Sequence, residues 1–288
     1  MARRDPFLRD PTHPVKPTPV GAIVILLVLI VLSLGALIPL YWMFATSLTP
    51  SAMAVKFPPE LIPGDPTLDN YRAVLRQPNF WRWVVNSAIQ AISVTAVIVA
   101  TASMAGYALA KLPFRGSKFL FWLFILSMML PFEAILVPLF LVITRLGMID
   151  TYAGLLLPLM AAPFAIFLMK QFIQTLPSEL IDAARVDGAS EPRIFWDVVL
   201  PLVRPGLAFL GIITFVAQWN LFVWPLVVTR SSEMRTLQVG LVLIREQEPL
   251  FFGLQMASAV MAAIPVVVVF FAFQRYFLRG VTVGALKG

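Results

Sequence analysis

The feature that most constrains this 288-residue chain is an uncharged apolar run that begins at Gly21, GAIVILLVLIVLSLGALIPL. A helix needs about 20 apolar residues to cross the hydrocarbon core of a bilayer, so this run is long enough for one crossing. Other long apolar stretches follow, and 59% of all residues are hydrophobic whereas 13% are charged. Soluble domains carry about 25% charged residues. The sequence therefore predicts an integral membrane protein, because a soluble fold of this size would lack polar surface.

Six transmembrane helices in an all-α fold account for these apolar stretches. We expect helices at about 21–47, 83–109, 119–143, 151–172, 205–228 and 252–277, tails at 1–20 and 278–288, and a polar loop at 173–204. Pro131 and Pro138 interrupt the third helix, and Pro158 and Pro163 lie in the fourth. Neighbouring helices must satisfy the backbone carbonyls that such prolines free, so the pattern predicts a packed bundle.

The distribution of Lys and Arg predicts the orientation of the bundle. If the N-terminus lies inside, the inner segments carry 14 of these residues and the outer segments carry eight. Because cytoplasmic loops are enriched in positive charge, both chain ends are predicted to face the cytoplasm. The positive charges form short scattered clusters without a basic stripe, so we expect no nucleic-acid partner. The chain lacks cysteine, which excludes disulfides and thiolate metal sites.

The polar loop, LPSELIDAARVDGASEPRIFWDVVLPLVRPG, predicts two short helices joined by a turn. Ser178 is expected to cap the first helix, and Gly188 is expected to end it in the left-handed region. Leu180, Ala183 and Ala184 are predicted to share one side of this amphipathic helix.

The second helix of the loop has its own boundary signals. Ser190 is its predicted N-cap, because Glu191 and Pro192 follow in the first turn. Pro201 is predicted to close it.

The same loop resembles a cytoplasmic motif of ABC importer permeases. That motif is Glu-Ala-Ala, three residues, Gly, nine residues, and then Ile-any-Leu-Pro. The matching residues here are Asp182, Ala183, Ala184, Gly188, Val198, Leu200 and Pro201. Asp182 stands where the family has Glu, and Val198 where it has Ile. Asp182 keeps the charge on a side chain one methylene shorter, so a contact made by the family's Glu would be weaker or remodelled.

The resemblance implies that the matching residues dock on a cytoplasmic ATPase, since the family uses this loop as a coupling helix. An ordinary amphipathic connector is the alternative interpretation. Other stretches, among them MLPFEAILVPLF and the ending FQRYFLRGVTVGALKG, resemble the maltose-transporter-like and glycerol-phosphate-transporter-like branch of these permeases. In the maltose-type relative the C-terminal tail contacts the ATPases, so the resemblance extends the same role to 284–288, with a frayed tail as the alternative.

The resemblance thus implies a non-catalytic translocation subunit of a binding-protein-dependent carbohydrate importer in the cell inner membrane. Its cargo would be an oligosaccharide or disaccharide, with glycerol phosphate or a polyol as the alternative and a stand-alone secondary transporter as a less favoured one. Its implied partners are a second permease in a heterodimer, with a second copy of this chain as the alternative, together with two ABC ATPases, an extracytoplasmic sugar-binding protein and membrane lipid. The sequence has no Walker A motif, so ATP and Mg²⁺ would be used by the separate ATPase and no cofactor by this chain.

Polar residues within the predicted helices are candidates for contact with a sugar, because a sugar site needs hydrogen-bonding groups in an otherwise apolar wall. The candidates are Asn86, Gln90, Ser93, Glu133, Gln218, Trp219 and Asn220. Glu133 is notable because a carboxylate at membrane depth should face a cavity or a partner. Packing is the alternative role for each, since such residues also form hydrogen bonds between helices. No cluster of His or carboxylate residues predicts a catalytic or metal site.

Overall fold

A computed structural model describes residues 18–50, 62–247 and 251–285, with side chains described as far as Gln274. Within these ranges every regular element is helical and none is a strand. The elements are α1 (Pro19–Ser47), α2 (Asp69–Leu75), α3 (Phe80–Lys111), α4 (Ser117–Ser127), α5 (Phe132–Arg145), α6 (Tyr152–Leu156), η2 (Leu157–Met160), α7 (Pro163–Gln174), α8 (Ser178–Val186), α9 (Glu191–Ile194), η3 (Phe195–Val199), α10 (Leu200–Leu202), α11 (Arg204–Trp219), α12 (Val223–Val228), α13 (Leu237–Gln247) and α14 (Phe252–Ala285).

Three helices are individually long and apolar enough to cross a membrane. They are α1, α3 and the part of α14 up to Gln274. Three pairs of shorter helices pass the same test together but are bent, by 98° between α4 and α5, by 41° between η2 and α7, and by 79° between α10 and α11. Among the described residues the number of candidate spans is therefore three, or six if each bent pair is one span.

Proline explains where the predicted continuous helices break. Its ring clashes with the carbonyl of the residue four positions earlier, which ends or kinks a helix. Pro131 lies four residues after Ser127, the last residue of α4, and Pro225 lies four residues after Leu221, in the gap between α11 and α12. The predicted fifth helix at 205–228 is therefore wrong as one continuous element. Pro138, in contrast, lies inside α5, which continues past it.

The last helix is longer than predicted. α14 continues to Ala285, so 278–285, which were predicted as part of the C-terminal tail, belong to the last helix. The predicted N-terminal tail lies outside the described residues as far as 17, and 286–288 also lie outside them.

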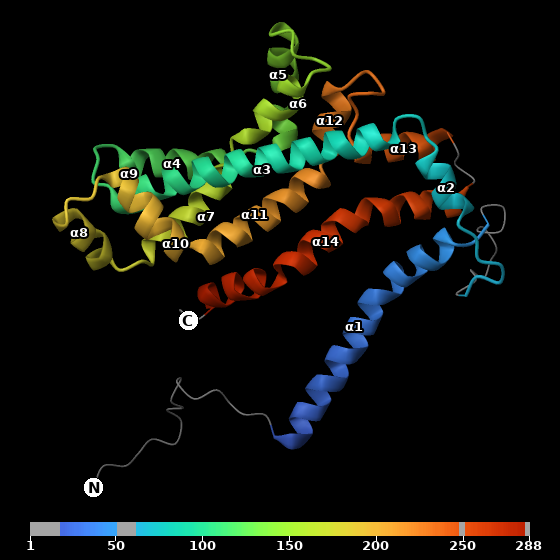
Figure 1. The fold of residues 1–288 in the computed structure, drawn as a ribbon, viewed down its shortest axis with the longest axis horizontal. Coiled ribbons are helices and arrows are strands. Elements are labelled where there is room, and N and C mark those ends of the chain that lie inside the picture. Colours follow the sequence, from blue (N-terminus) through green and yellow to red (C-terminus); the bar gives the residue numbers. More distant parts are fainter. Residues whose placement is uncertain (1–17, 51–61, 248–250, 286–288) are drawn as a thin grey trace.

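Helix α3 is the central element of the fold (Figure 1). At one end it lies beside α4, α7 and α9, and at the other it lies beside α13. A buried cluster around Ala102 and Met169 joins α3 to α7, and a second cluster around Phe80 and Trp219 joins the start of α3 to α11, α13 and α14. Close approach of α3 to α7 requires Gly106, because a Cβ there would lie 2.8 Å from the backbone nitrogen of Lys170. Helix α1 contacts α14 at one end and extends away from the other helices.

Candidate functional site

The loop that carries the motif forms a compact helical hairpin at one end of α3 (Figure 1). We call the segment from α8 to α10 the hairpin. Gly188 adopts φ +79°, which confirms the predicted left-handed end of α8. The amide of Gly188 donates to the carbonyl of Arg185 at 3.0 Å, and the amide of Ala189 donates to the carbonyl of Ala184 at 3.0 Å. Ser190 occupies the N-cap position of α9 as predicted, but its side chain makes no capping hydrogen bond.

Two predicted boundaries of the hairpin are each displaced by one residue. Pro177, not Ser178, precedes the first turn of α8, and the hydroxyl of Ser178 instead accepts a hydrogen bond from Lys111 Nζ at 3.1 Å. Pro201 is the last residue but one of the second helix, because α9, η3 and α10 follow one another without a gap as far as Leu202. The bend follows Pro201, between α10 and α11.

The two sides of α8 differ in what they contact. Ile181 is buried against the core that α3 and α7 share, and the half-buried Ala184 packs against the same core. Leu180 and Ala183 are exposed, and Val186 is 87% exposed. Leu180, Ala183 and Ala184 lie on one side of α8 by their helical spacing, as predicted, and Ala184 stands at the edge of that side that meets the core. The exposed side of α8 is available to a partner, whereas the buried side fixes the helix to the bundle.

Charged side chains fix the turn of the hairpin to α3. Arg185 donates from Nε to Glu191 Oε1 at 2.7 Å and from Nη1 to Asp182 Oδ1 at 2.9 Å. The hydroxyl of Tyr107, in the last turns of α3, donates to Glu191 Oε2. Lys111 Nζ donates to the carbonyl of Leu176 at 2.6 Å. These bonds join the hairpin to the end of α3 from both sides.

The same contacts shift the protonation equilibria of the turn. The hydrogen bond from Arg185, and then that from Tyr107, hold the pKa of Glu191 below its ordinary value. The bond to Glu191 also raises the pKa of Arg185. Both side chains are therefore charged at neutral pH. The sequence did not identify a functional role for Tyr107, Lys111 or Glu191. Only the fold brings positions 107 and 191 together.

The motif residues divide into two groups in the structure. Asp182, Ala183 and Gly188 are exposed at the outward side and the turn of the hairpin. Val198 and Leu200 are half-buried and pack against the core of the bundle, and Pro201 is half-buried beside them. The first group is accessible at the surface of the hairpin, and the second group is packed against the bundle.

Asn86 is fully buried and its carboxamide is satisfied by protein groups. Its Nδ2 donates to the carbonyls of Glu233 and Arg235 at 2.7 and 2.8 Å, and its Oδ1 accepts from the hydroxyl of Tyr152 at 2.6 Å. These bonds hold the segment between α12 and α13 against α3. The geometry gives Asn86 a packing role, which was the alternative interpretation.

Gln90 and Gln218 lie together in the buried part of the bundle. Gln90 Nε2 donates to the carbonyl of Gln218 at 3.1 Å. The side-chain oxygens of both residues are buried, and neither has a hydrogen-bond partner in the protein. Buried polar atoms are nearly always satisfied by protein or water, so these two oxygens are the best placed of the candidates to accept a hydrogen bond from another molecule. Trp219 is buried beside them, and its Nε1 donates to the carbonyl of Ala262 at 3.0 Å.

The remaining candidates are not gathered with these. Ser93 is half-buried on α3, one turn beyond Gln90. Glu133 is exposed in the first turn of α5, directly after the 98° bend. Asn220 is exposed at the end of α11, where its Nδ2 donates to the carbonyl of Val216 and its Oδ1 accepts from Gln238. The structure therefore brings Gln90, Gln218 and Trp219 together and leaves Glu133 and Asn220 exposed.

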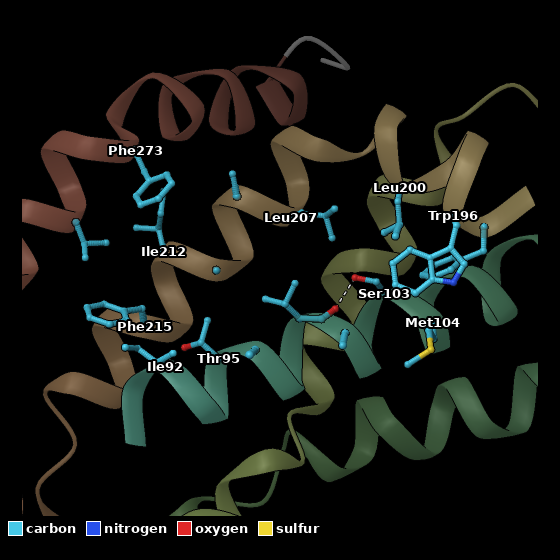
Figure 2. Close-up of a pocket in the computed structure, with 17 residues that line it drawn as sticks. Ile92, Thr95, Ser103, Met104, Trp196, Leu200, Leu207, Ile212, Phe215 and Phe273 are labelled. Carbon is cyan, nitrogen blue, oxygen red and sulfur yellow. Dashed lines mark hydrogen bonds between the residues drawn. The ribbon is translucent and has the colours of Figure 1, made fainter. Parts of the chain in front are cut away.

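A groove of about 680 Å³ lies between α3, α11 and α14 (Figure 2). Nearly all of its lining is apolar, and the hydroxyl of Ser103 is bonded to the carbonyl of Val99 in its own helix. Such a lining offers few hydrogen-bonding groups to a sugar. Among the described residues no group of His, Cys, Asp and Glu side chains has an arrangement that would hold a metal ion.

Comparison with known proteins identifies relatives along most of the chain. Residues 98–283 match the family described as binding-protein-dependent transport system inner membrane component. The arabinooligosaccharides transport system permease protein AraQ of Halalkalibacterium halodurans is 39% identical over 256 residues, which cover 88% of this chain and 92% of the relative. The sn-glycerol-3-phosphate transport system permease protein UgpE of Yersinia pestis is 36% identical over 262 residues, covering 88% of this chain and 93% of the relative.

A solved structure has the same fold. It is a chain of a bacterial ABC transporter involved in the import of the acidic polysaccharide alginate, with a TM-score of 0.79 and 27% identity over 90% of this chain and 96% of that chain. The chain thus has the helical fold of an ABC importer permease, and it belongs to the family of binding-protein-dependent inner-membrane transport components.

Proposed function

We propose that this chain is the membrane-spanning translocation subunit of an ATP-driven importer that receives its cargo from a binding protein. Relatives named for arabinooligosaccharide and sn-glycerol-3-phosphate transport, and the structural relative involved in alginate import, support a carbohydrate cargo. An oligosaccharide or disaccharide is the cargo we favour, and glycerol phosphate or a polyol is the alternative that the second relative supports. A secondary transporter working alone is less favoured.

The observation that carries the proposal is the hairpin. Its outward side is exposed at Asp182 and Ala183, while Ile181 is buried and Glu191 is bonded to Tyr107 and Arg185. A helical projection fixed in this way moves as one body with the helices behind it, so a force applied to it reaches the membrane. We infer that it docks in a groove of a separate ATPase subunit, which binds ATP and Mg²⁺, and that this chain has no catalytic residue.

The assembly we propose has two permeases, two ATPases and one extracytoplasmic sugar-binding protein. The second permease would be a different chain, as in heterodimeric importers. Both ends of this chain and the hairpin would face the cytoplasm, and the segment between α12 and α13 would face the binding protein. The excess of Lys and Arg in the predicted inner segments supports this orientation.

Reconstitution tests the transport proposal. The complete complex is placed in liposomes, and uptake of labelled oligosaccharide is measured with and without ATP and the loaded binding protein. We expect uptake only when both are present, and none when the phosphate-loop lysine of the ATPase is replaced. Uptake by this chain alone, driven by an ion gradient, would contradict the proposal.

Calorimetry separates the two cargo classes. The binding protein that stimulates the complex is titrated with an arabinooligosaccharide, a disaccharide and glycerol 3-phosphate. Binding of a saccharide alone is the expected result, whereas binding of glycerol 3-phosphate alone would establish the alternative.

A further inference from the structure

The apolar groove between α3, α11 and α14 has the size of a ligand site. Its volume of about 680 Å³ falls within the range of about 300–1,000 Å³ typical of small-molecule sites. Helix α3 contributes Ile92 and Met104, α11 contributes Leu207 and Phe215, and Phe273 of α14 forms a further wall (Figure 2). A hydrocarbon chain suits this lining. Apart from Trp196, its polar side chains are Ser103, which is bonded within its own helix, and Thr95, whose hydroxyl oxygen has no partner in the protein.

The length of the groove corresponds to half of a bilayer. Its lining on α3 extends from Ile92 to Met104, about 18 Å at 1.5 Å per residue. The hydrocarbon core of a bilayer is about 30 Å thick, so the groove spans roughly one leaflet. The hairpin contributes Trp196 and Leu200 to one end, which places the groove in the leaflet on the side of the hairpin.

A positive charge lies at the hairpin end of the groove. Arg204 precedes the lining residues Leu207, Ala208 and Gly211 by three, four and seven positions, so it lies on the same face of α11. Arg204 is exposed, and no carboxylate among the described residues lies within ion-pair distance of it. The nearby Arg193, by contrast, pairs with Asp197 at 3.4 Å.

The environment of Arg204 favours an anion. It stands in the first turn of α11, a turn without acidic residues. The start of a helix carries a partial positive charge, which disfavours a cation there unless an anion lies nearby. Trp196 is 63% exposed beside the groove, and tryptophan is enriched where the membrane meets water. The Arg204 end of the groove therefore lies at headgroup depth.

We propose that this groove binds an anionic phospholipid of the hairpin-side leaflet, with one acyl chain between α3, α11 and α14 and the phosphate beside Arg204. The apolar lining, the one-leaflet length and the free cation at the headgroup end each match a part of that lipid. The lining contains none of the residues considered above for contact with a sugar, and the site requires only that the chain sits in a membrane. A bound lipid would support the junction where α10 turns 79° into α11.

Lipid retention tests this site. The complete transporter is assembled in nanodiscs of equal parts phosphatidylglycerol and phosphatidylcholine, extracted into detergent, washed, and analysed for lipid per complex by mass spectrometry. We expect the wild type to retain phosphatidylglycerol, Arg204→Gln to retain about fivefold less, and Arg204→Lys to retain nearly all of it. Arg115→Gln is the matched control, since Arg115 is exposed in the loop between α3 and α4, and it should retain the wild-type amount.

A second variant tests the acyl-chain part of the groove. Gly211 lines the groove, and an added Cβ there meets no heavy atom within 4 Å, so the side chain of Gly211→Leu should extend into the groove. It should lower retention of both lipids while the melting temperature stays within a few degrees. Equal phosphatidylglycerol retention by wild type and Arg204→Gln would overturn the proposal. It would also be overturned if Gly211→Cys cross-linked to the second permease, because a partner helix would then fill the groove.

Discussion

Gly188 is the residue on which the shape of the hairpin turn depends. Its φ of +79° lies in the region that costs residues with a Cβ roughly 1–2 kcal/mol, and β-branched residues fit it worst. Gly188→Val should therefore displace α8 from its place and uncouple transport, while the protein still inserts in the membrane. The measurements are ATP-dependent uptake in liposomes and copurification of the ATPase.

Gly188→Asn is the matched control. Asparagine tolerates the left-handed region, and an added Cβ at this position meets no heavy atom within 4 Å. Its uptake should be close to that of the wild type. Normal uptake together with normal ATPase binding in Gly188→Val would contradict the docking role of the hairpin.

Glu191 makes the stability of the hairpin depend on pH. Because Arg185 and Tyr107 lower its pKa from the ordinary value of 4.5, the ionised carboxylate stabilises the folded hairpin above that pH, and this stabilisation disappears as the pH falls through the lowered pKa. The side chains of Arg185 and Glu191 are 33% and 41% exposed, so solvent screening limits the ion pair to about 0.2–1 kcal/mol.

Hydrogen exchange measures this contribution. After correction for intrinsic rates, amide protection in α8 should be constant between pH 7 and pH 5 and should fall below about pH 4.5. In Glu191→Gln we expect weaker protection at neutral pH and no acid transition. A fall in wild-type protection centred near pH 6 would assign the stabilisation to another group.

At the level of elements, small residues set how closely the helices pack. A Cβ on Gly106 would lie 2.9 Å from Met169 Cβ and 2.8 Å from Lys170 N, so α3 and α7 would have to separate. Gly106→Ala should destabilise the protein by about 1–3 kcal/mol, as overpacked substitutions do. Gly35→Ala in α1 is the control, because no heavy atom lies within 4 Å of its added Cβ. The melting temperatures of the two variants are measured in detergent. Equal values would show that α3 and α7 separate at little cost in stability.

The sequence predicted helices correctly where their positions depend on prolines and on the length of an apolar run. It predicted helices across all six apolar stretches and a break near Pro131, where α4 ends. The prediction of one continuous helix was wrong near Pro225, where the apolar run continues although the helix does not. Apolar runs do not distinguish one straight helix from two bent ones, because both bury the same residues. Angles such as the 98° between α4 and α5 therefore came only from the structure.

At the level of the whole molecule, the predicted orientation can be tested with single cysteines, because the natural chain has none. Glu233 is exposed between α12 and α13, and Asp187 is exposed in the hairpin at the other end of α3. A membrane-impermeant maleimide should label Glu233→Cys in intact cells and Asp187→Cys only after permeabilisation. The reverse pattern would place the hairpin outside and remove it from contact with a cytoplasmic ATPase.

The candidate site was only partly predictable from the sequence. A motif in one continuous segment identified the hairpin, and Gly188 was assigned its conformation from residue type alone. The supports of the hairpin at Tyr107 and Lys111 are far from it in sequence, and nothing local marks them. Polar residues within the spans could be found from the sequence, but their roles could not. Residue type does not distinguish Asn86, whose carboxamide is bonded to protein groups, from Gln90, whose side-chain oxygen has no partner.

The partners of Asn86 also bear on how the protein is made. The carbonyls that its side chain binds lie 147 and 149 residues further along the chain. At about 5–20 residues per second, a ribosome that has just incorporated Asn86 needs roughly 7–30 s to reach them. During that interval the carboxamide has none of these carbonyl partners, so the insertion machinery or water must solvate it. Biogenesis of this chain therefore includes a period in which its central helix is in place while two of the hydrogen bonds of Asn86 await the segment between α12 and α13.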